Sequence, residues 1–230
     1  MPTSNASTFV VVPTYNEATA LRQTLLPLVY EGYSVVVVDD CSTDNTLDTI
    51  QDLSLHYLRH PINLGQGAAL QTGMRYAVAQ GAEYVVHFDA DGQHDHREIQ
   101  TLLAPVKAGK ADIALGSRFQ RADDVEAVPV LRRALLKVAT IVNGVTTGLW
   151  LTDAHNGFRA MNRRAAEAIC ISENRMAHAT EILSLIRQNR LHYQEVPVHI
   201  VYTEYSKQKG QSASNAFNIL IDLILKKLLL

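Results

Sequence analysis

Two aspartates with one residue between them, Asp89 and Asp91, follow the apolar run from Tyr84 to Phe88 and precede Gly92. The run has the length of a buried strand, and ligands of open α/β sheets bind at the carboxyl ends of strands. Two carboxylates in that position suit Mg²⁺ or Mn²⁺, which also binds a substrate diphosphate. Because Asp and Gly are ordinary turn residues, the pattern alone favours a metal site and a solvated turn equally.

The strands that must position these carboxylates alternate with helices in the first half of the chain. Apolar runs of strand type occupy residues 9–12, 35–38, 56–59 and 111–115, and helical patterns occupy 18–30, 68–80 and 97–108. A further helix is expected to carry Leu47, Ile50 and Leu53 on one face. The alternation predicts an α/β fold with a mostly parallel central sheet and helices on both faces. Acidic or glycine-rich turns after the first four strands would gather at one edge of that sheet.

The second half of the chain is less regular. Its pattern predicts an apolar helical stretch over 130–151, a turn-rich segment over 153–159, helices over 163–171 and 178–189, and strands over 193–198 and 200–202. We expect residues 1–212 to form one domain and residues 213–230 to form an amphipathic helix. Its apolar surface suits a membrane interface, a small membrane protein, a second copy of the chain or the protein core.

Composition narrows the possible classes of protein. The 230 residues are 47% hydrophobic and 19% charged, which is typical of a globular protein. A net charge of −2 gives no general attraction to nucleic acid. Cys41 and Cys170 match neither a disulfide framework nor a zinc site, and they suit a reducing compartment. Without a secretory signal or an apolar run of membrane-spanning length, we expect a cytoplasmic protein.

Two further patterns have simple structural explanations. The loop Asn63-x-Gly65-x-Gly67 lacks the third glycine of a dinucleotide fingerprint and follows the third strand, which favours a tight turn that begins a helix over a phosphate cradle. The histidines lack the spacing of a His-x-x-x-His metal site, so we expect them at the surface or behind the metal ligands. They are His94, His155 and His178.

Several of these segments occur together and in a set order. They are Pro13-Thr14-Tyr15-Asn16-Glu17, Val37-Val38-Asp39-Asp40-Cys41-Ser42-Thr43-Asp44-Asn45-Thr46, Asn63-Leu64-Gly65-Gln66-Gly67-Ala68, Asp89-Ala90-Asp91-Gly92-Gln93-His94 and Gly116-Ser117-Arg118. The set resembles the inverting glycosyltransferases of the GT-A fold, and most of all the dolichyl- and polyprenyl-phosphate sugar synthases. The segment Asp153-Ala154-His155-Asn156-Gly157-Phe158-Arg159 is similar to the Asp-x-x-x-Gly-Phe motif of that branch. The resemblance covers residues 8 to 212.

The resemblance implies a nucleotide-sugar donor and a divalent cation, Mg²⁺ or Mn²⁺. It places Asp91 as the direct metal ligand, Asp89 on metal or ribose with Ala90 between them, and Gln93 beside metal and diphosphate. The base and ribose would be held by Pro13, Tyr15, Glu17 and Asp39. The branch usually ends with Gly-x-Ser-Lys, whereas Ser212 precedes an alanine here, so Lys207 or Lys209 would contact the diphosphate instead.

The acceptor implied by the resemblance is a polyprenyl phosphate at the inner face of the cell membrane. Arg118 and Arg133 match basic positions expected to meet its phosphate, and Arg132 is an alternative to Arg133. The expected reaction is inverting transfer of a hexose from a UDP- or GDP-sugar, and a phosphate acceptor needs no general base.

Two other functions stay open at this point. Transfer to a saccharide hydroxyl in polysaccharide synthesis would require a base, for which Asp153 is the candidate, with Glu181 behind it. A non-catalytic scaffold would use the last helix to dock a membrane protein. The intact Asp89-x-Asp91 pattern argues against the scaffold.

Overall fold

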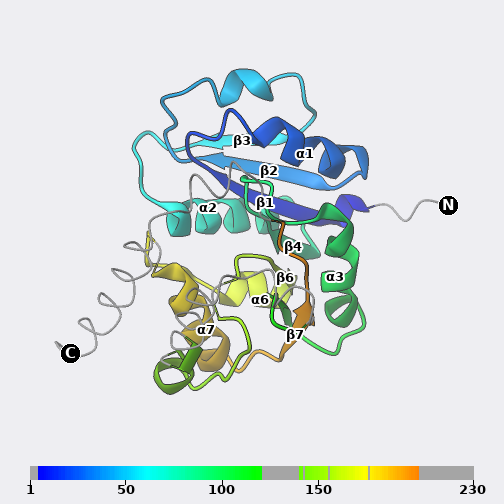
Figure 1. Cartoon of the computed structure of the whole chain (residues 1–230), viewed down its shortest axis with the longest axis vertical. Helices are drawn as coiled ribbons and strands as arrows, with labels where there is room; N and C mark the ends of the chain where they lie inside the picture. Colours follow the sequence, from blue (N-terminus) through cyan, green and yellow to red (C-terminus); the bar gives the residue numbers. More distant parts are fainter. Residues whose placement is uncertain (1–4, 121–139, 142, 155, 176, 202–230) are drawn as a thin grey trace.

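The computed structural model describes residues 5–120, 140–141, 143–154, 156–175 and 177–201. Within these residues a seven-stranded sheet has the order β3-β2-β1-β4-β6-β5-β7 (Figure 1). The predicted C-terminal helix and the boundary at residue 212 lie outside the described residues. Among the helices of the described ranges, none combines the length and apolarity needed to span a membrane.

Four parallel strands form the first half of the sheet, as the alternating pattern predicted. They are β1 (Thr8–Thr14), β2 (Ser34–Asp39), β3 (His56–Arg59) and β4 (Tyr84–His87). β1 pairs in parallel with both β2 and β4, and every residue of β1 is buried. A strand that is covered on both faces has a continuous apolar sequence, and for this reason the position of β1 could be predicted. The carboxyl ends of β1, β2 and β4 therefore meet at one edge.

The second half of the sheet contains an antiparallel strand that the sequence pattern did not reveal. β6 (Arg159–Asn162) lies between β4 and β5 (Ile113–Ser117) and runs antiparallel to both. β7 (Tyr193–Pro197) then pairs in parallel with β5. Because β6 begins where β4 ends, the turn-rich segment before it lies beside the Asp89–Asp91 loop.

Helices cover both faces of the sheet. They are α1 (Leu21–Tyr30), α2 (Gln66–Ala79), α3 (Ile99–Lys107), α6 (Arg163–Ala168) and α7 (His178–Gln188), with short 3-10 helices at Asn5–Ser7, Leu47–Thr49 and His96–Glu98. Successive strand residues face opposite sides. Val11 accordingly packs with α2, α6 and α7 in one core, and Val10 and Val12 pack with α1 and α3 in the other.

Some predicted elements are shorter than the pattern indicated. The helix expected through Leu53 is only the 3-10 helix Leu47–Thr49, because Asp44 and Thr46 are used to hold neighbouring backbone groups. Within the 130–151 stretch, the described residues 140–141 and 143–147 are helical, and Gly148, at a φ of 73°, follows them. In the expected strand over 200–202, Ile200 makes an isolated bridge to His94.

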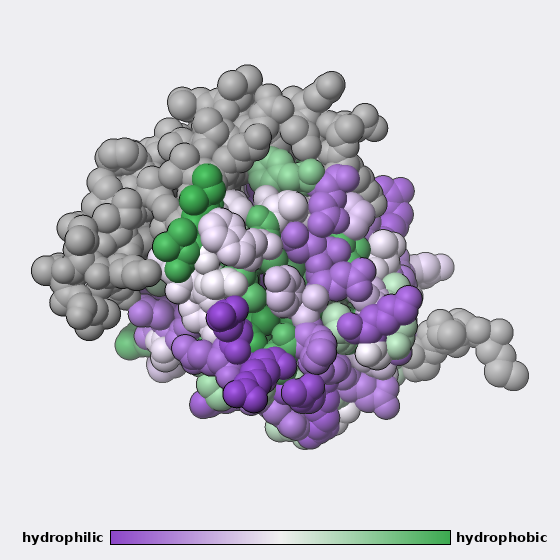
Figure 2. Space-filling view, turned by 90° about the horizontal axis from the view of Figure 1, so that it is seen from below, coloured by the Kyte–Doolittle hydropathy of each residue, from purple (hydrophilic) through white to green (hydrophobic). Residues whose placement is uncertain are grey.

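The 140–147 helix and the loop after it expose apolar side chains. Ile141, Val145 and Trp150 are 57%, 65% and 65% exposed, and Arg187 of α7 donates to the carbonyl of Gly148 at 3.2 Å. The face toward the α7 end of the molecule shows apolar and strongly hydrophilic side chains next to one another (Figure 2). In the sequence, these exposed residues come just before the segment that contains Asp153.

Candidate active site

A pocket of about 350 Å³ lies at the carboxyl edge of β1, β2 and β4. Its lining is Pro13, Thr14, Tyr15, Glu17, Asp40, Gln66, Ala69, Asp89, Ala90, Asp91 and Gln93. Among the described residues predicted to bind the donor, Asp39 alone does not line this pocket. The structure therefore brings together most of a set whose members come from three different strand ends.

The two oxygens of Asp89 are held by side chains from two different elements. Gln66, the first residue of α2, donates to Oδ1 at 3.1 Å, and Nε2 of His94 lies 2.9 Å from Oδ2. Although burial by itself would raise the pKa of Asp89, the hydrogen bond with His94 and the positive charge of Arg159 bring it below its ordinary value. Asp89 is therefore a fixed, ionised carboxylate.

Asp91 is held less tightly and lines two clefts. Its Oδ1 accepts from the backbone N–H of Gln93 at 3.1 Å, and it also borders a second cleft of about 550 Å³ between α1 and residues 92–97. Burial and the nearby negative charge of Asp89 raise the pKa of Asp91 to about 6, and Glu17 adds to this effect. Among the residues that the structure describes, none compensates the negative charge of Asp91 enough to keep its pKa at the ordinary value.

This charge pattern fits a divalent cation that is completed by a substrate. No group of three or more His, Cys, Asp or Glu in the described ranges could hold a metal ion unaided. Two carboxylates of an acidic pocket that Gln93 also lines match Mg²⁺ or Mn²⁺ sites in which diphosphate and water supply the other ligands. Asp91 is the available ligand because Asp89 is already hydrogen-bonded on both oxygens.

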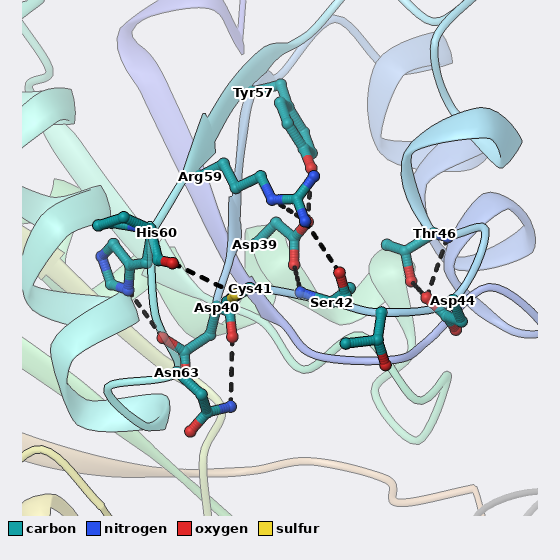
Figure 3. A network of polar contacts seen from close by, with 12 residues as sticks. Asp39, Asp40, Cys41, Ser42, Asp44, Thr46, Tyr57, Arg59, His60 and Asn63 are labelled. Atoms are coloured by element: carbon teal, nitrogen blue, oxygen red, sulfur yellow. Dashed lines mark hydrogen bonds and ion pairs between the residues drawn. The ribbon is translucent and has the colours of Figure 1, made fainter.

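Asp39 and Asp40 at the end of β2 organise two different loops (Figure 3). Asp39, 1% exposed, accepts from the backbone N–H of Ser42 at 2.8 Å and from the hydroxyl of Tyr57 at 2.5 Å, and Arg59 lies 3.8 Å away. Burial, followed by the hydrogen bond to Asp39, raises the pKa of Tyr57. The predicted role of Asp39 in base or ribose binding stays a prediction.

Asp40 was not among the predicted site residues, although it lines the pocket. Its carboxylate accepts from the backbone N–H groups of Leu64 and Gly65 at 2.9 and 2.6 Å, and it contacts Nδ1 of His60 at 2.8 Å. Asp40 thereby fixes the loop from which α2 begins.

The glycines of that loop serve close packing, as the tight-turn interpretation suggested. A Cβ on Gly65 would lie 2.4 Å from the carbonyl oxygen of Asn174, and one on Gly67 would lie 2.0 Å from that of Glu173. The N–H of Gly67 donates to the Asn174 carbonyl at 2.8 Å. Residues 173–174, rather than a phosphate, therefore occupy the N-terminus of α2.

Arg118 and Asp153, predicted to act on the acceptor, are paired with each other. Nε of Arg118 donates to Oδ2 of Asp153 at 2.6 Å, and their side chains are 10% and 1% exposed. Glu195 accepts from the backbone N–H of Asp153 at 3.2 Å. Glu181, the second candidate base, instead binds the backbone N–H groups of residues 172 and 173. Arg133, its alternative Arg132, and Lys207 and Lys209 lie outside the described residues, as does His155.

Three buried basic or ionisable side chains lie close enough to Asp89 to interact with it electrostatically. Arg159 of β6 lies opposite His87 of β4 in the antiparallel strand register, and His178 is the first residue of α7. Burial lowers the pKa of Arg159 to about 10, even though Asp89 and Asp153 oppose the change, and burial lowers the pKa of His87 to about 3. Arg159 therefore supplies the positive charge next to both carboxylates. His178 and His94 are 4% and 8% exposed, so neither lies at the surface, and His94 contacts Asp89 from the alternative position behind the expected metal ligands.

Sequence reasoning missed four residues that shape the site: Asp40, Gln66, Gly157 and Arg159. A Cβ on Gly157 would lie 2.6 Å from Oδ2 of Asp89, so this glycine leaves room for the carboxylate. All four belong to segments that the motif analysis had singled out. The motifs therefore contained these residues, but the contacts that place them in the site join segments far apart in the sequence.

Comparisons with known proteins identify the family of the chain. The family described as Glycosyl transferase family 2 matches residues 9–170. The chain is 26% identical over 240 residues to UDP-N-acetylglucosamine–dolichyl-phosphate N-acetylglucosaminyltransferase of Methanococcus voltae. This match covers 96% of each chain. It is 31% identical over 225 residues to polyprenol monophosphomannose synthase of Mycolicibacterium smegmatis. This second match covers 92% of this chain and 82% of the relative.

A solved structure shows the same fold. It is glucosyl-3-phosphoglycerate synthase from Mycobacterium tuberculosis in complex with Mn²⁺ and UDP-glucose, with a TM-score of 0.62 and 20% identity. The match covers 95% of this chain and 78% of that one. The expected GT-A fold is thereby confirmed.

Proposed function

The chain belongs to glycosyl transferase family 2, and on this premise we propose that it transfers a hexose from a nucleotide diphosphate sugar to polyprenyl phosphate. The transfer inverts the anomeric carbon and uses Mg²⁺ or Mn²⁺. The relatives named for dolichyl-phosphate and polyprenol transfer support the acceptor, and the neighbour crystallised with Mn²⁺ and UDP-glucose supports the donor class. The acceptor would be met at the cytoplasmic face of the membrane.

The donor half of the proposal is supported by the acidic pocket. A cation held by Asp91, with Gln93 and Asp89 beside it, would neutralise the charge that develops on the departing nucleoside diphosphate. Pro13, Tyr15 and Glu17 line the same pocket and would contact the nucleoside. Asp39, Lys207 and Lys209 complete the donor site that we propose.

One observation favours a phosphate acceptor over a saccharide hydroxyl. A hydroxyl must lose a proton to a base. Both candidate bases are committed elsewhere: Asp153 is 1% exposed and bound to Arg118, and Glu181 holds the backbone of residues 172 and 173. A phosphate anion needs no base, and Arg118 with Arg133 would position it for in-line attack.

The test offers two acceptors in one assay. The protein is incubated with Mn²⁺ and labelled UDP-glucose, UDP-N-acetylglucosamine or GDP-mannose, together with undecaprenyl phosphate and a neutral oligosaccharide. We expect label in the lipid fraction with one of the donors, and loss of that label with EDTA. Label on the oligosaccharide alone would refute the lipid acceptor, and no metal-dependent transfer from any donor would favour the scaffold.

A further inference from the structure

His94 is fixed on all sides next to the proposed metal site. Its ring stacks on Phe158, with centroids 4.8 Å apart and planes 23° apart, and meets Phe88 edge-on at 5.4 Å. Its backbone forms a bridge with Ile200. The side chain is 3% exposed, so the imidazole has one orientation available to it.

Among the described residues, the imidazole of His94 forms one hydrogen bond, and its partner is Asp89. Nε2 lies 2.9 Å from Oδ2, and because an ionised carboxylate only accepts, Nε2 must carry the proton. Nδ1 is buried without a hydrogen-bond partner among the described residues. The ring therefore contributes packing through its faces and a single polar contact through Nε2.

Asp89 depends on this contact for its orientation. Gln66 holds Oδ1 from the start of α2, His94 holds Oδ2, and the bare Cα of Gly157 borders the same oxygen. Without the N–H of His94, one of the two side-chain hydrogen bonds that orient the carboxylate is lost. The carboxylate could then rotate away from a cation or ribose.

We propose that His94 is a positioning residue, which orients Asp89 for the cation and nucleotide through Nε2–H. The role rests on the proposed function, because it presumes a nucleotide and metal at Asp89 and Asp91. Partners behind a metal ligand typically change metal affinity by about 10- to 100-fold when they are removed. The aromatic packing of His94 and its hydrogen bond can be separated by substitution.

Two substitutions separate these contributions. His94→Phe keeps a ring to stack on Phe158 and removes the N–H, whereas His94→Gln removes the ring and places an amide N–H near the position of Nε2. His56→Phe is the matched control. His56 also stacks with an aromatic ring, Phe9, and hydrogen-bonds a side chain, Tyr76, but it lies at the amino end of β3, away from the pocket.

The experiment measures binding of UDP and of GDP by calorimetry, with MnCl₂ and with EDTA, and the melting temperature of each protein without ligand. We expect His94→Phe to keep a melting temperature near that of the wild type and to lose about 10- to 100-fold in Mn²⁺-dependent nucleotide affinity. We expect His94→Gln to melt lower and yet bind more tightly than His94→Phe. His56→Phe should bind like the wild type.

The opposite order of stability and binding is the decisive result, because a purely structural histidine would lose both together. Wild-type affinity in His94→Phe, or affinities that follow the melting temperatures, would overturn the positioning role while the proposed function stands. A wild type that binds neither nucleotide with Mn²⁺ would overturn the proposed function and this role with it.

Discussion

The donor side and the acceptor side of the sheet edge handle charge in opposite ways. On the donor side, the loops after β1, β2 and β4 bring carboxylates into one pocket, and in the described part of the chain Asp91 has no positive partner strong enough to keep its pKa low. On the acceptor side, Arg118 forms an ion pair with Asp153 at 2.6 Å, and Arg159 adds positive charge near the same carboxylate. Among the described residues, the first region leaves Asp91 without a cationic partner, whereas in the second region Asp153 is already paired with Arg118.

This difference indicates how each side would respond to its ligand. A cation entering the donor pocket removes a repulsion that the folded protein carries, so its binding also stabilises the fold. A phosphate reaching Arg118 must share the guanidinium with Asp153, which suits Arg because its five N–H donors can serve two anions. Substitutions on the two sides should therefore separate stability from activity in different ways.

The largest expected effect is on the donor side. Asp91→Asn should lower metal-dependent transfer by about 10³-fold or more, because the cation loses its available ligand. Asp89→Asn should lower it too and should also weaken nucleotide binding, since Asp89 faces both ribose and metal in the proposed site. Steady-state transfer and calorimetric binding of the same proteins measure the two effects.

Asp48→Asn, in the 3-10 helix Leu47–Thr49, is the control for a carboxylate outside the pocket and should leave both measurements unchanged. Equal transfer by Asp91→Asn and the wild type would contradict the assignment of the metal ligand. Identical defects in the two site variants would contradict the distinction between Asp89 and Asp91.

The next effect concerns the pair of Arg118 and Asp153. Arg118→Gln should lower the free energy of unfolding by about 3 kcal/mol, because it removes the ion pair that Arg118 forms with the buried carboxylate of Asp153. Arg118→Met combined with Asp153→Leu should regain much of that stability, since apolar residues often replace a buried pair without loss. It should not regain transfer to lipid phosphate. Urea denaturation and the lipid assay of the same proteins provide the comparison.

The exposed pair Arg22–Asp52 is the control, with side chains 41% and 60% exposed. Exposed ion pairs contribute little, so Arg22→Gln should leave unfolding nearly unchanged. Full lipid transfer by the double variant would show that Arg118 has a structural role only.

The parallel half of the fold could be predicted because its strands are buried on both faces and therefore read as apolar runs. β6 could not, because its four residues begin with Arg159 and end with Asn162. Its position is decided by pairing with β4 and β5, which no local pattern records. The same limit applies to residues 47–53, where side-chain contacts from Asp44 and Thr46 prevail over helical periodicity.

For the site, the sequence identified the acidic residues that follow strands but not the groups that hold them. The resemblance implied different roles for Asp89 and Asp91, but the sequence does not show what makes the two carboxylates different. Their difference arises from Gln66 on α2 and from the ring of His94, whose place depends on Phe158 before β6. Contacts between distant segments require the fold, so only the structure separates a fixed carboxylate from an available one.

The smallest expected effect is the pH dependence that Asp91 gives to stability. Its pKa is raised from 3.8 to about 6 in the folded protein, so between these values the folded state binds more protons than the unfolded state. The free energy of unfolding should therefore fall as the pH rises from about 4 to about 6, by about 1–2 kcal/mol after allowance for solvent screening.

Asp91→Asn should lack this pH-dependent contribution to stability. In EDTA, its stability relative to the wild type should be greater at about pH 7.5 than at about pH 4.5. Adding Mn²⁺ and nucleotide should reverse that order near neutral pH, because only the wild type gains the binding free energy. Urea midpoints measured at both pH values would contradict this account if the two proteins differed equally at each.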